Sequence, residues 1–378
     1  MVTVNCGEAN LKYTGEKMKN RRNDTGFYIM TALACLAAMI IIVIAALLVY
    51  DKIKENAEQK GQEVMSDAEE MYTIDEVDEL ISDAVDNALA DAEIDAREAA
   101  ENAEQELLAN IAQALGNGST VMETLRPLYP DKIVVASGGV YHFVPINREL
   151  RLNELVQDNL NVLESGEFQY VVNDQVTSRK GIDVSLYQGK IDWQQVAADG
   201  VEYVFIRVGY RGYGQEGRMV IDEKFATNIV GAKSAGLKVG VYFFGQATNV
   251  EEAKEEANLV LEQLAPYSID YPVVYDVERV SAESGRANSL DATTRTDVVI
   301  AFLETVKAAG YKPMVYANME MYSVLLEIER LEEYDKWFAY YGSQMYFPYH
   351  YDVWQYTEKG RVAGIDGNVD MNISFKEW

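Results

Sequence analysis

Cysteine and histidine are scarce in this sequence of 378 residues, which has 2 of each. Cys6 and Cys35 both precede residue 50, so the bulk of the chain has neither a disulfide framework nor a thiolate metal site. His142 and His350 are too few for a serine–histidine triad or a histidine-based zinc site. The groups that remain available for catalysis are carboxylates, tyrosines or a carboxylate-bound cation. We predict carboxylate chemistry with no metal and no cofactor.

Basic side chains are also in the minority, with Lys+Arg 33 against Asp+Glu 61 and a formal net charge of -28. A chain this acidic repels a phosphate backbone, so we predict no nucleic-acid partner. The charge is unevenly distributed, because residues 51–116 alone hold 20 acidic and 4 basic side chains.

A stretch without any charged side chain covers residues 27–50 (FYIMTALACLAAMIIIVIAALLVY). Its length suffices for one helix across a lipid bilayer. Basic residues crowd the preceding segment 1–26, and the positive-inside bias then places the N-terminus in the cytoplasm and everything after Asp51 outside the cell. A cleaved signal peptide is disfavoured because LLVYDK offers no small-x-small cleavage site. We predict a single-pass anchor in the cell membrane.

Residues 51–116 lack proline and are rich in Ala, Glu, Asp, Asn and Gln. Apolar residues recur there at helical spacing, at Ile74, Val77, Ile81 and Val85. This pattern predicts an extended helical stalk, with a thin apolar stripe for self-association as a weak coiled coil. A disordered acidic spacer is the alternative. In either form the segment holds the rest of the chain away from the membrane.

Residues 117–179 begin with the helix-breaking Asn117-Gly118-Ser119. Strand-like apolar runs follow at 132–136, 140–144 and 168–172, with a helical pattern at 152–163. The mixture predicts a small α+β module whose sequence indicates no chemistry. His142 is interpreted as a half-buried strand residue.

Strand and helix patterns alternate through residues 180–378. Strands are expected at 181–184, 203–208, 238–243, 271–277, 312–316, 336–340, 353–356 and 369. Helices are expected at 193–198, 222–235, 250–264, 293–309 and 319–331. No glycine-rich phosphate loop follows the first strand. The glycine-rich loop 210–220 is interpreted as a plain connection, with a mobile rim of the site as the alternative. The repeated βα units predict an α/β fold with a TIM-like (β/α) barrel in which some strands can be irregular.

Carboxylates end several of the predicted barrel strands. Asp276 and Glu278 share one face of the fourth strand because strand side chains alternate. Asp183 ends the first strand and Asp370 lies in the last one. Active sites of β/α barrels form at the carboxyl ends of the strands, so we expect all four acids in one site. Burial and mutual repulsion should keep one of them protonated near neutral pH, as general acid catalysis requires.

Aromatic residues accompany these acids, and an aromatic trough with acids at its rim is suited to stacking sugar rings and protonating a glycosidic oxygen. We predict substrate contacts from Tyr242, Tyr275, Tyr316, Trp337, Tyr341, Trp354 and Gln355.

Several motifs in residues 180–378 resemble those of the glycoside hydrolase family 25 muramidases, the Chalaropsis-type lysozymes. They are Gly181-Ile182-Asp183-Val184-Ser185, Phe205-Ile206-Arg207-Val208-Gly209, Asp276-x-Glu278, Trp354-Gln355-Tyr356 and Gly367-Asn368-Val369-Asp370. They occur in the family's order and spacing, and the resemblance does not extend to residues 1–179.

The resemblance implies cleavage of the β-1,4 bond between N-acetylmuramic acid and N-acetylglucosamine in peptidoglycan glycan strands, in a bacterial envelope of the Gram-positive kind. It implies that Glu278 is the general acid/base and that Asp276 orients and stabilises the substrate's N-acetyl group. Asp183 and Asp370 would be flanking acids that tune this pair. Such substrate assistance implies retention of configuration without a second acid at nucleophile distance.

Two other functions fit parts of the sequence. A catalytically inactive scaffold of the cell envelope would bind glycan without cutting it, but such a protein would tolerate amides where this chain has four acids. Another carboxylate-based barrel hydrolase would use a bound divalent cation and would lose its activity in chelator.

Overall fold

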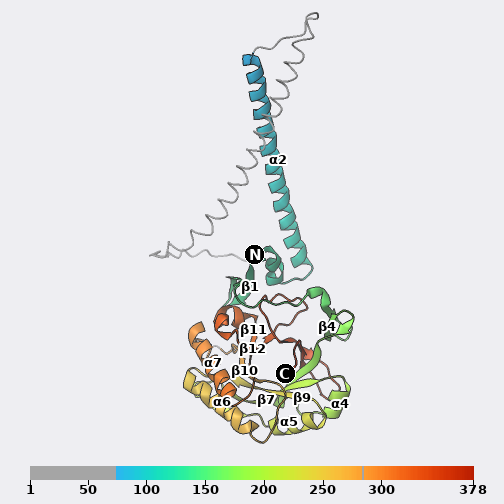
Figure 1. Cartoon of the computed structure of the whole chain (residues 1–378), viewed down its shortest axis with the longest axis vertical. Helices are drawn as coiled ribbons and strands as arrows, with labels where there is room; N and C mark the ends of the chain where they lie inside the picture. Colours follow the sequence, from blue (N-terminus) through green and yellow to red (C-terminus); the bar gives the residue numbers. More distant parts are fainter. Residues whose placement is uncertain (1–73, 283–284) are drawn as a thin grey trace, which may run out of the picture. The chain divides into compact units, whose positions relative to one another are not determined.

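The computed structural model describes residues 74–282 and 285–378 (Figure 1). Two units are distinguished, residues 1–101 and 102–378. The predicted cytoplasmic segment 1–26 and membrane span 27–50 lie outside the described residues. In the part of the chain that is described, no helix combines the length and the apolar character needed to cross a membrane.

Helix α2 (Ile74–Gly116) has 43 residues, which corresponds to about 65 Å at 1.5 Å per residue. The helical interpretation of the stalk is therefore confirmed for this range, whereas residues 51–73 lie outside the description. Side chains from Asp78 to Asn110 are exposed. The helix ends before Gly118, whose positive φ of 91° suits glycine. Self-association through α2 stays a prediction.

Residues 117–179 form short elements, as expected for a small mixed module: α3 (Val121–Leu125), η1 (Arg126–Leu128), β1 (Lys132–Ser137), β2 (Val140–Pro145), η2 (Gln157–Asn159), β3 (Leu160–Val162), β4 (Phe168–Val172) and β5 (Gln175–Val176). Strands β1 and β2 form one antiparallel hairpin, and β3, β4 and β5 form a second sheet. His142 is half-buried in β2.

The helix predicted at 152–163 is wrong. This stretch contains a bridge from Leu152 to Tyr349, then η2 and β3. Its apolar residues Leu152, Leu155 and Leu160 pack against the core of the barrel. Their helix-like spacing therefore reflects contact with another part of the chain, which a local pattern does not reveal.

Eight strands close a barrel in the order β6-β14-β13-β12-β11-β10-β9-β7, and β7 pairs again with β6. The strands are β6 (Arg179–Val184), β7 (Tyr203–Arg211), β9 (Lys238–Gly245), β10 (Val273–Val277), β11 (Pro313–Asn318), β12 (Asp335–Ala339), β13 (Val353–Gly360) and β14 (Val369–Ser374). Helices between them are α4 (Trp193–Ala198), α5 (Phe225–Ser234), α6 (Val250–Leu264) and α7 (Ala292–Ala308). The predicted α/β barrel is confirmed.

Local capping explains why several helix boundaries match the sequence pattern. The side chain of Asn249 accepts a hydrogen bond from the Glu252 amide at the start of α6, and Asp291 does the same for Thr294 at the start of α7. Gly236 and Gly310 follow α5 and α7 with φ near +84° and +91°, where glycine ends a helix without strain.

The barrel departs from a regular one in three places. Strand β14 is antiparallel to both β13 and β6. The predicted connection 210–220 is a hairpin in which β8 (Met219–Ile221) pairs with the end of β7. The helix expected at 319–331 is broken into two short pieces, the π-helix η4 (Met321–Leu325) and the 3₁₀-helix η5 (Ile328–Leu331). Helices therefore cover only part of the barrel wall.

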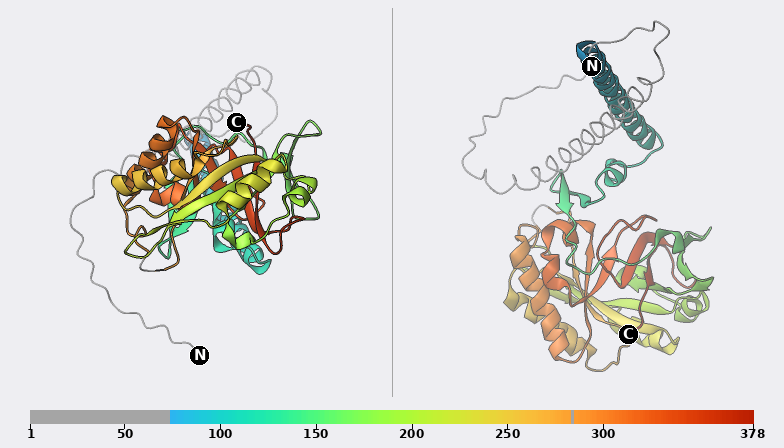
Figure 2. Two further views of the ribbon diagram at one scale, coloured as in Figure 1. Left: turned by 90° about the horizontal axis from the view of Figure 1, so that it is seen from below. Right: turned by 45° about the horizontal axis from the view of Figure 1, so that its top comes forward.

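Residues 117–179 cover part of the barrel that helices leave open. The Phe168 ring stacks on Tyr356 at 4.2 Å between centroids and meets Trp354 edge-on at 5.3 Å. Figure 2 shows the green strands of this region beside the red C-terminal strands, while the yellow and orange helices lie elsewhere on the barrel. Residues 117–179 thus belong to the same compact unit as the barrel.

Candidate active site

An open cleft of about 260 Å³ lies at the carboxyl ends of the parallel strands. Its lining residues are Asp183, Arg207, Tyr242, Phe244, Asp276, Glu278, Tyr316, Trp337, Tyr341, Gln355 and Asp370. The structure therefore brings together the four acids that the sequence predicted to meet. The cleft also contains Tyr242, Tyr316, Trp337, Tyr341 and Gln355 from the predicted substrate-contact set.

Asp183 and Asp370 are direct neighbours, because they are paired in the antiparallel register of β6 and β14. One Asp183 oxygen accepts hydrogen bonds from Gln355 and Asn372, both at 2.9 Å. Burial raises the pKa of Asp183 to about 6 despite these bonds. Burial, followed by the charge of Asp183, raises the pKa of Asp370 to about 8. Two neighbouring carboxyls therefore resist being charged together.

Asp276 lies on the inner face of β10, in register with Phe244 of β9 and Tyr316 of β11. Burial, followed by the charge of Glu278, raises its pKa well above the ordinary value. Its Oδ1 atom is buried and has no hydrogen-bond partner among the described residues. A buried acceptor left open at the floor of a cleft is suited to an N–H or O–H group of a ligand.

Glu278 follows β10 directly and is half-buried at the cleft. Burial raises the pKa of its carboxyl above the ordinary value, and the neighbouring Tyr316 hydroxyl lowers it in part. A carboxyl whose charged form is disfavoured by burial, in a cleft open to ligand, has a property that favours a general acid.

A chain of hydrogen bonds connects the cleft's tyrosines to Asp183. The hydroxyls of Tyr316 and Tyr341 both donate to Oε1 of Gln355, at 2.7 and 3.0 Å. Gln355 then donates from Nε2 to Asp183. A second connection runs from the Trp337 indole N–H, which donates to Asn372 at 2.8 Å. These bonds fix the side chains that surround Asp183.

The cleft's aromatic residues differ in what they offer a ligand. Trp337 is only 1% exposed and belongs to the barrel interior, where it stacks on Phe205 at 4.5 Å. Tyr341 lies in the loop after β12 and is 52% exposed. Tyr341 is therefore the better placed of the two for stacking on a sugar ring.

Two predicted contact residues do not line the cleft, and these predictions require correction. Tyr275 is buried on the outer side of β10, where its hydroxyl donates to Glu256 of α6 at 2.8 Å. Trp354 is buried on the outer side of β13, and its indole N–H donates to the Tyr340 carbonyl at 2.8 Å. Both precede an inward-facing residue, so strand alternation turns them away from the cleft.

Arg207 and Phe244 line the cleft although they were not among the predicted site residues. The Arg207 guanidinium pairs with Asp222 at 2.8 Å, and its charge lowers the pKa of Asp276 in part. The sequence contained a signal for Arg207, because it is a charged residue inside the otherwise apolar strand 203–208. Phe244 carried no such signal, because it reads as an ordinary strand residue.

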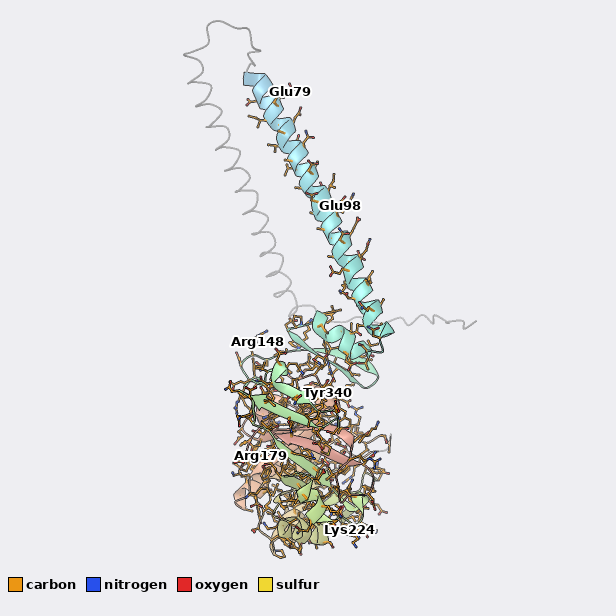
Figure 3. All side chains as sticks on the ribbon, turned by 90° about the vertical axis from the view of Figure 1, so that its right-hand side faces the viewer. Glu79, Glu98, Arg148, Arg179, Lys224 and Tyr340 are labelled. Atoms are coloured by element: carbon orange, nitrogen blue, oxygen red, sulfur yellow. The ribbon has the colours of Figure 1, made fainter. Side chains whose placement is uncertain are left out.

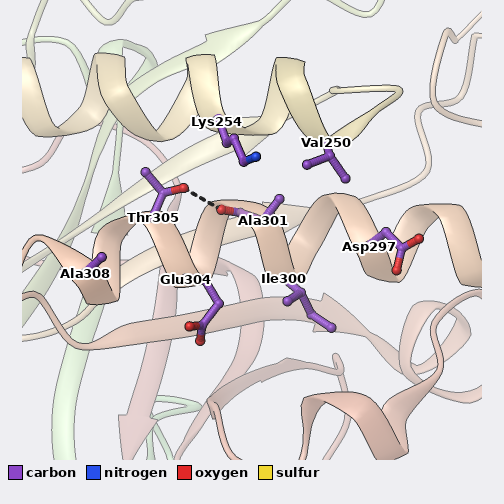
Figure 4. Close-up of a pocket in the computed structure, with 8 residues that line it drawn as sticks. All are labelled: Val250, Lys254, Asp297, Ile300, Ala301, Glu304, Thr305 and Ala308. Carbon is purple, nitrogen blue, oxygen red and sulfur yellow. Dashed lines mark hydrogen bonds between the residues drawn. The ribbon is translucent and has the colours of Figure 1, made fainter.

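A larger hollow of about 540 Å³ lies on the outside of the barrel, between α6 and α7 (Figure 4). Val250, Ile300 and Ala301 line it together with the charged Lys254 and Glu304 at its edges. None of the four acids reaches it. Among the described residues, no three histidine, cysteine or acidic side chains are placed to hold a metal ion.

The eight-stranded α/β barrel with a carboxylate-lined cleft at the strand ends is the arrangement found in barrel enzymes that work through acidic side chains. The family model that matches this chain is described as "Glycosyl hydrolases family 25" and covers residues 182–365. This range contains Asp183, Asp276 and Glu278, whereas Asp370 lies just beyond it. The chain belongs to glycosyl hydrolase family 25.

Individual relatives are similar over about half of the chain. YegX of Escherichia coli strain K12 is 30% identical over 203 residues, which are 51% of this chain and 68% of YegX. The autolytic lysozyme of Clostridium acetobutylicum is 28% identical over 194 residues, 51% of this chain and 55% of that protein. The solved structure of the modular autolysin LytC from Streptococcus pneumoniae, in complex with a synthetic peptidoglycan ligand, has a TM-score of 0.47 and 26% identity, covering 57% of this chain and 52% of LytC.

Proposed function

We propose that this protein is a membrane-anchored peptidoglycan hydrolase that cleaves the β-1,4 bond between N-acetylmuramic acid and N-acetylglucosamine. Membership of glycosyl hydrolase family 25 supports hydrolysis of a glycosidic bond. The autolytic lysozyme among the relatives supports the cell wall as its substrate. The uncharged stretch 27–50 supports an anchor with the barrel outside the cell.

The unpartnered Oδ1 of Asp276 is the single observation that carries the proposed mechanism. In the mechanism, this oxygen accepts the N–H of the substrate's N-acetyl group and turns the acetyl oxygen toward the anomeric carbon. Glu278 donates its proton to the glycosidic oxygen as the bond breaks, and later takes a proton from the attacking water. The acetyl oxygen attacks from the face opposite the leaving group, and water then attacks from the face that the leaving group has left, so two inversions retain the configuration.

The first test is digestion of purified cell walls by the full-length chain and by Glu278→Gln. The amide has nearly the same shape but no proton to give, so we expect the release of muropeptides to fall at least about a hundredfold. Thermal stability should change little, because the amide keeps the shape of the carboxyl and burial already disfavours the charged form of Glu278. A variant that digests walls as fast as the wild type would remove Glu278 from the acid role.

Mass analysis of the released fragments identifies the bond. A muramidase leaves reducing N-acetylmuramic acid, whereas reducing N-acetylglucosamine would indicate a different glycosidase. Binding of walls without any release by the wild type would favour the glycan-binding scaffold instead. Activity that disappears in chelator would favour a cation-dependent hydrolase.

A further inference from the structure

The loop between β12 and β13, residues 340–352, carries Tyr341 and has an unusual support. Helices follow several other barrel strands, but in this described stretch no helix connects β12 to β13. The exposed Tyr341 ring is tied to the barrel through its hydroxyl, which donates to Gln355. The loop is also held by its buried side chains Phe347 and Tyr349 and by contacts along its backbone.

The segment 147–157, which precedes β3, runs antiparallel to this loop. Leu152 forms an antiparallel bridge with Tyr349. The Asn153 amide donates to the Pro348 carbonyl at 2.8 Å, and the His350 amide donates to the Arg151 carbonyl at 3.0 Å. Segment 147–157 is thus paired with the loop through backbone hydrogen bonds.

Gln157 extends this pairing to the part of the loop nearest Tyr341. Its Nε2 donates to the Ser343 carbonyl at 2.8 Å, and its Oε1 accepts from the Met345 amide at 2.8 Å. One side-chain amide therefore satisfies a backbone acceptor and a backbone donor two residues apart. Both bonded groups lie within four residues of Tyr341.

Arg126 of η1 holds the same loop from a second direction. Its guanidinium donates to the Tyr340 hydroxyl at 3.0 Å and lies over the Tyr346 ring at 4.4 Å. The labelled Tyr340 in Figure 3 lies in the part of the barrel next to these N-terminal elements. Arg126 and Gln157 therefore contact the loop on both sides of Tyr341, at Tyr340 and at residues 343–346.

We propose that Gln157 is a positioning residue for the glycan cleft, which holds the β12–β13 loop so that Tyr341 is in place to stack on a sugar ring. The inference rests on the proposed function, and it assigns to residues 117–179 a role in substrate binding. Gln157 does not line the cleft and acts through the loop. Its removal should weaken glycan binding without affecting proton transfer by Glu278.

The test compares Gln157→Ala with Gln175→Ala in the full-length chain. Gln175 is an exposed glutamine of β5 in the same region, which makes it a matched control. We expect Gln157→Ala to raise the KM for glycan about five- to tenfold, the size expected when one or two hydrogen bonds are lost, with kcat changed less than about twofold. Gln157→Glu keeps the acceptor for the Met345 amide but loses the donor to the Ser343 carbonyl. Its KM should therefore lie between those of the wild type and Gln157→Ala.

Hydrogen exchange separates this inference from the proposed function. Amides of residues 341–346 should exchange faster in Gln157→Ala than in Gln175→Ala if Gln157 holds the loop. An unchanged KM and unchanged exchange in an active Gln157→Ala enzyme would overturn the inference alone. A loss confined to kcat would also overturn it. A wild type that releases no glycan fragment would overturn the proposed function, and the link from Gln157 to sugar binding with it.

Discussion

At the scale of single residues, the raised pKa of Asp370 makes the stability of the folded protein depend on pH. Its pKa is raised from the ordinary 3.8 to about 8 by burial and by Asp183. The folded state therefore binds this proton more tightly than the unfolded state does. Stability contributed by the protonated group is full below the unfolded pKa and is lost as the pH rises toward the folded pKa.

Asp370→Asn removes this titration, since an amide stays neutral at every pH. We expect the Tm of the variant to exceed that of the wild type at pH 8 by roughly 2–4 °C, the shift that about 1 kcal/mol produces in a protein of this size. At pH 4 the two should melt together. Calorimetric scans of both proteins across this range check the prediction, and a variant that is less stable at pH 8 would contradict it.

Asp276→Asn addresses the buried oxygen that has no partner. The variant keeps an oxygen that accepts a hydrogen bond but loses the carboxylate charge, which would stabilise the positive charge that develops on the N-acetyl group as it attacks. We expect kcat on glycan to fall by about 10²–10³, as for the loss of one electrostatic stabiliser, with KM nearly unchanged. Steady-state kinetics on soluble glycan measure both constants. A variant with full kcat would show that Asp276 only shapes the cleft.

Residue parity determined which of the predicted residues line the cleft. Asp276 and Glu278 both line it, because alternate residues of a strand share a face. The same rule excludes Tyr275, which lies between Val274 and Asp276, and it excludes Trp354 once Gln355 faces inward. Tyr341 lies beyond the end of β12, so parity does not apply to it, and only the structure shows its hydroxyl on Gln355.

At the scale of elements, local sequence predicted most of the barrel. Helix α6 has the predicted bounds, because Asn249 supplies a cap and the apolar spacing is regular. The antiparallel direction of β14 was not predicted, because an apolar run carries no direction. The short connection 361–368 was the available signal, since neighbouring parallel strands need a longer crossover. The false helix at 152–163 arose from contacts with the barrel, which are non-local.

Strand β4 provides a test of how residues 117–179 cover the barrel. Phe168 is buried between Trp354 and Tyr356. We expect Phe168→Ala to lower the free energy of unfolding by about 3–5 kcal/mol, the range for a truncated core aromatic. Phe143→Ala is the control, because Phe143 of β2 is 37% exposed, and its cost should stay below about 1 kcal/mol. Urea unfolding of the full-length chain gives both values, and equal losses would contradict the prediction.

At the scale of the whole molecule, residues 51–116 and residues 117–179 differ in their charge and in their contacts with the barrel. Residues 51–116 hold 20 acidic and 4 basic side chains, and the side chains of α2 from Asp78 to Asn110 are exposed to solvent. Residues 117–179 have the opposite character. Their apolar and hydrogen-bonding groups are committed to the barrel, through Leu152, Gln157 and Phe168.

This division predicts where the chain tolerates truncation. A fragment of residues 180–378 contains every acid of the cleft but exposes Trp354, Tyr356 and the unsupported β12–β13 loop. We expect it to aggregate or to bind a hydrophobic dye without a cooperative melt, as a loosely packed state does. A fragment of residues 117–378 keeps the covering elements and should melt cooperatively near the full-length Tm. Size-exclusion chromatography and thermal melts of the two fragments decide the matter. Equal stability would mean that the barrel folds without its N-terminal cover, and residues 117–179 would then serve the cleft alone.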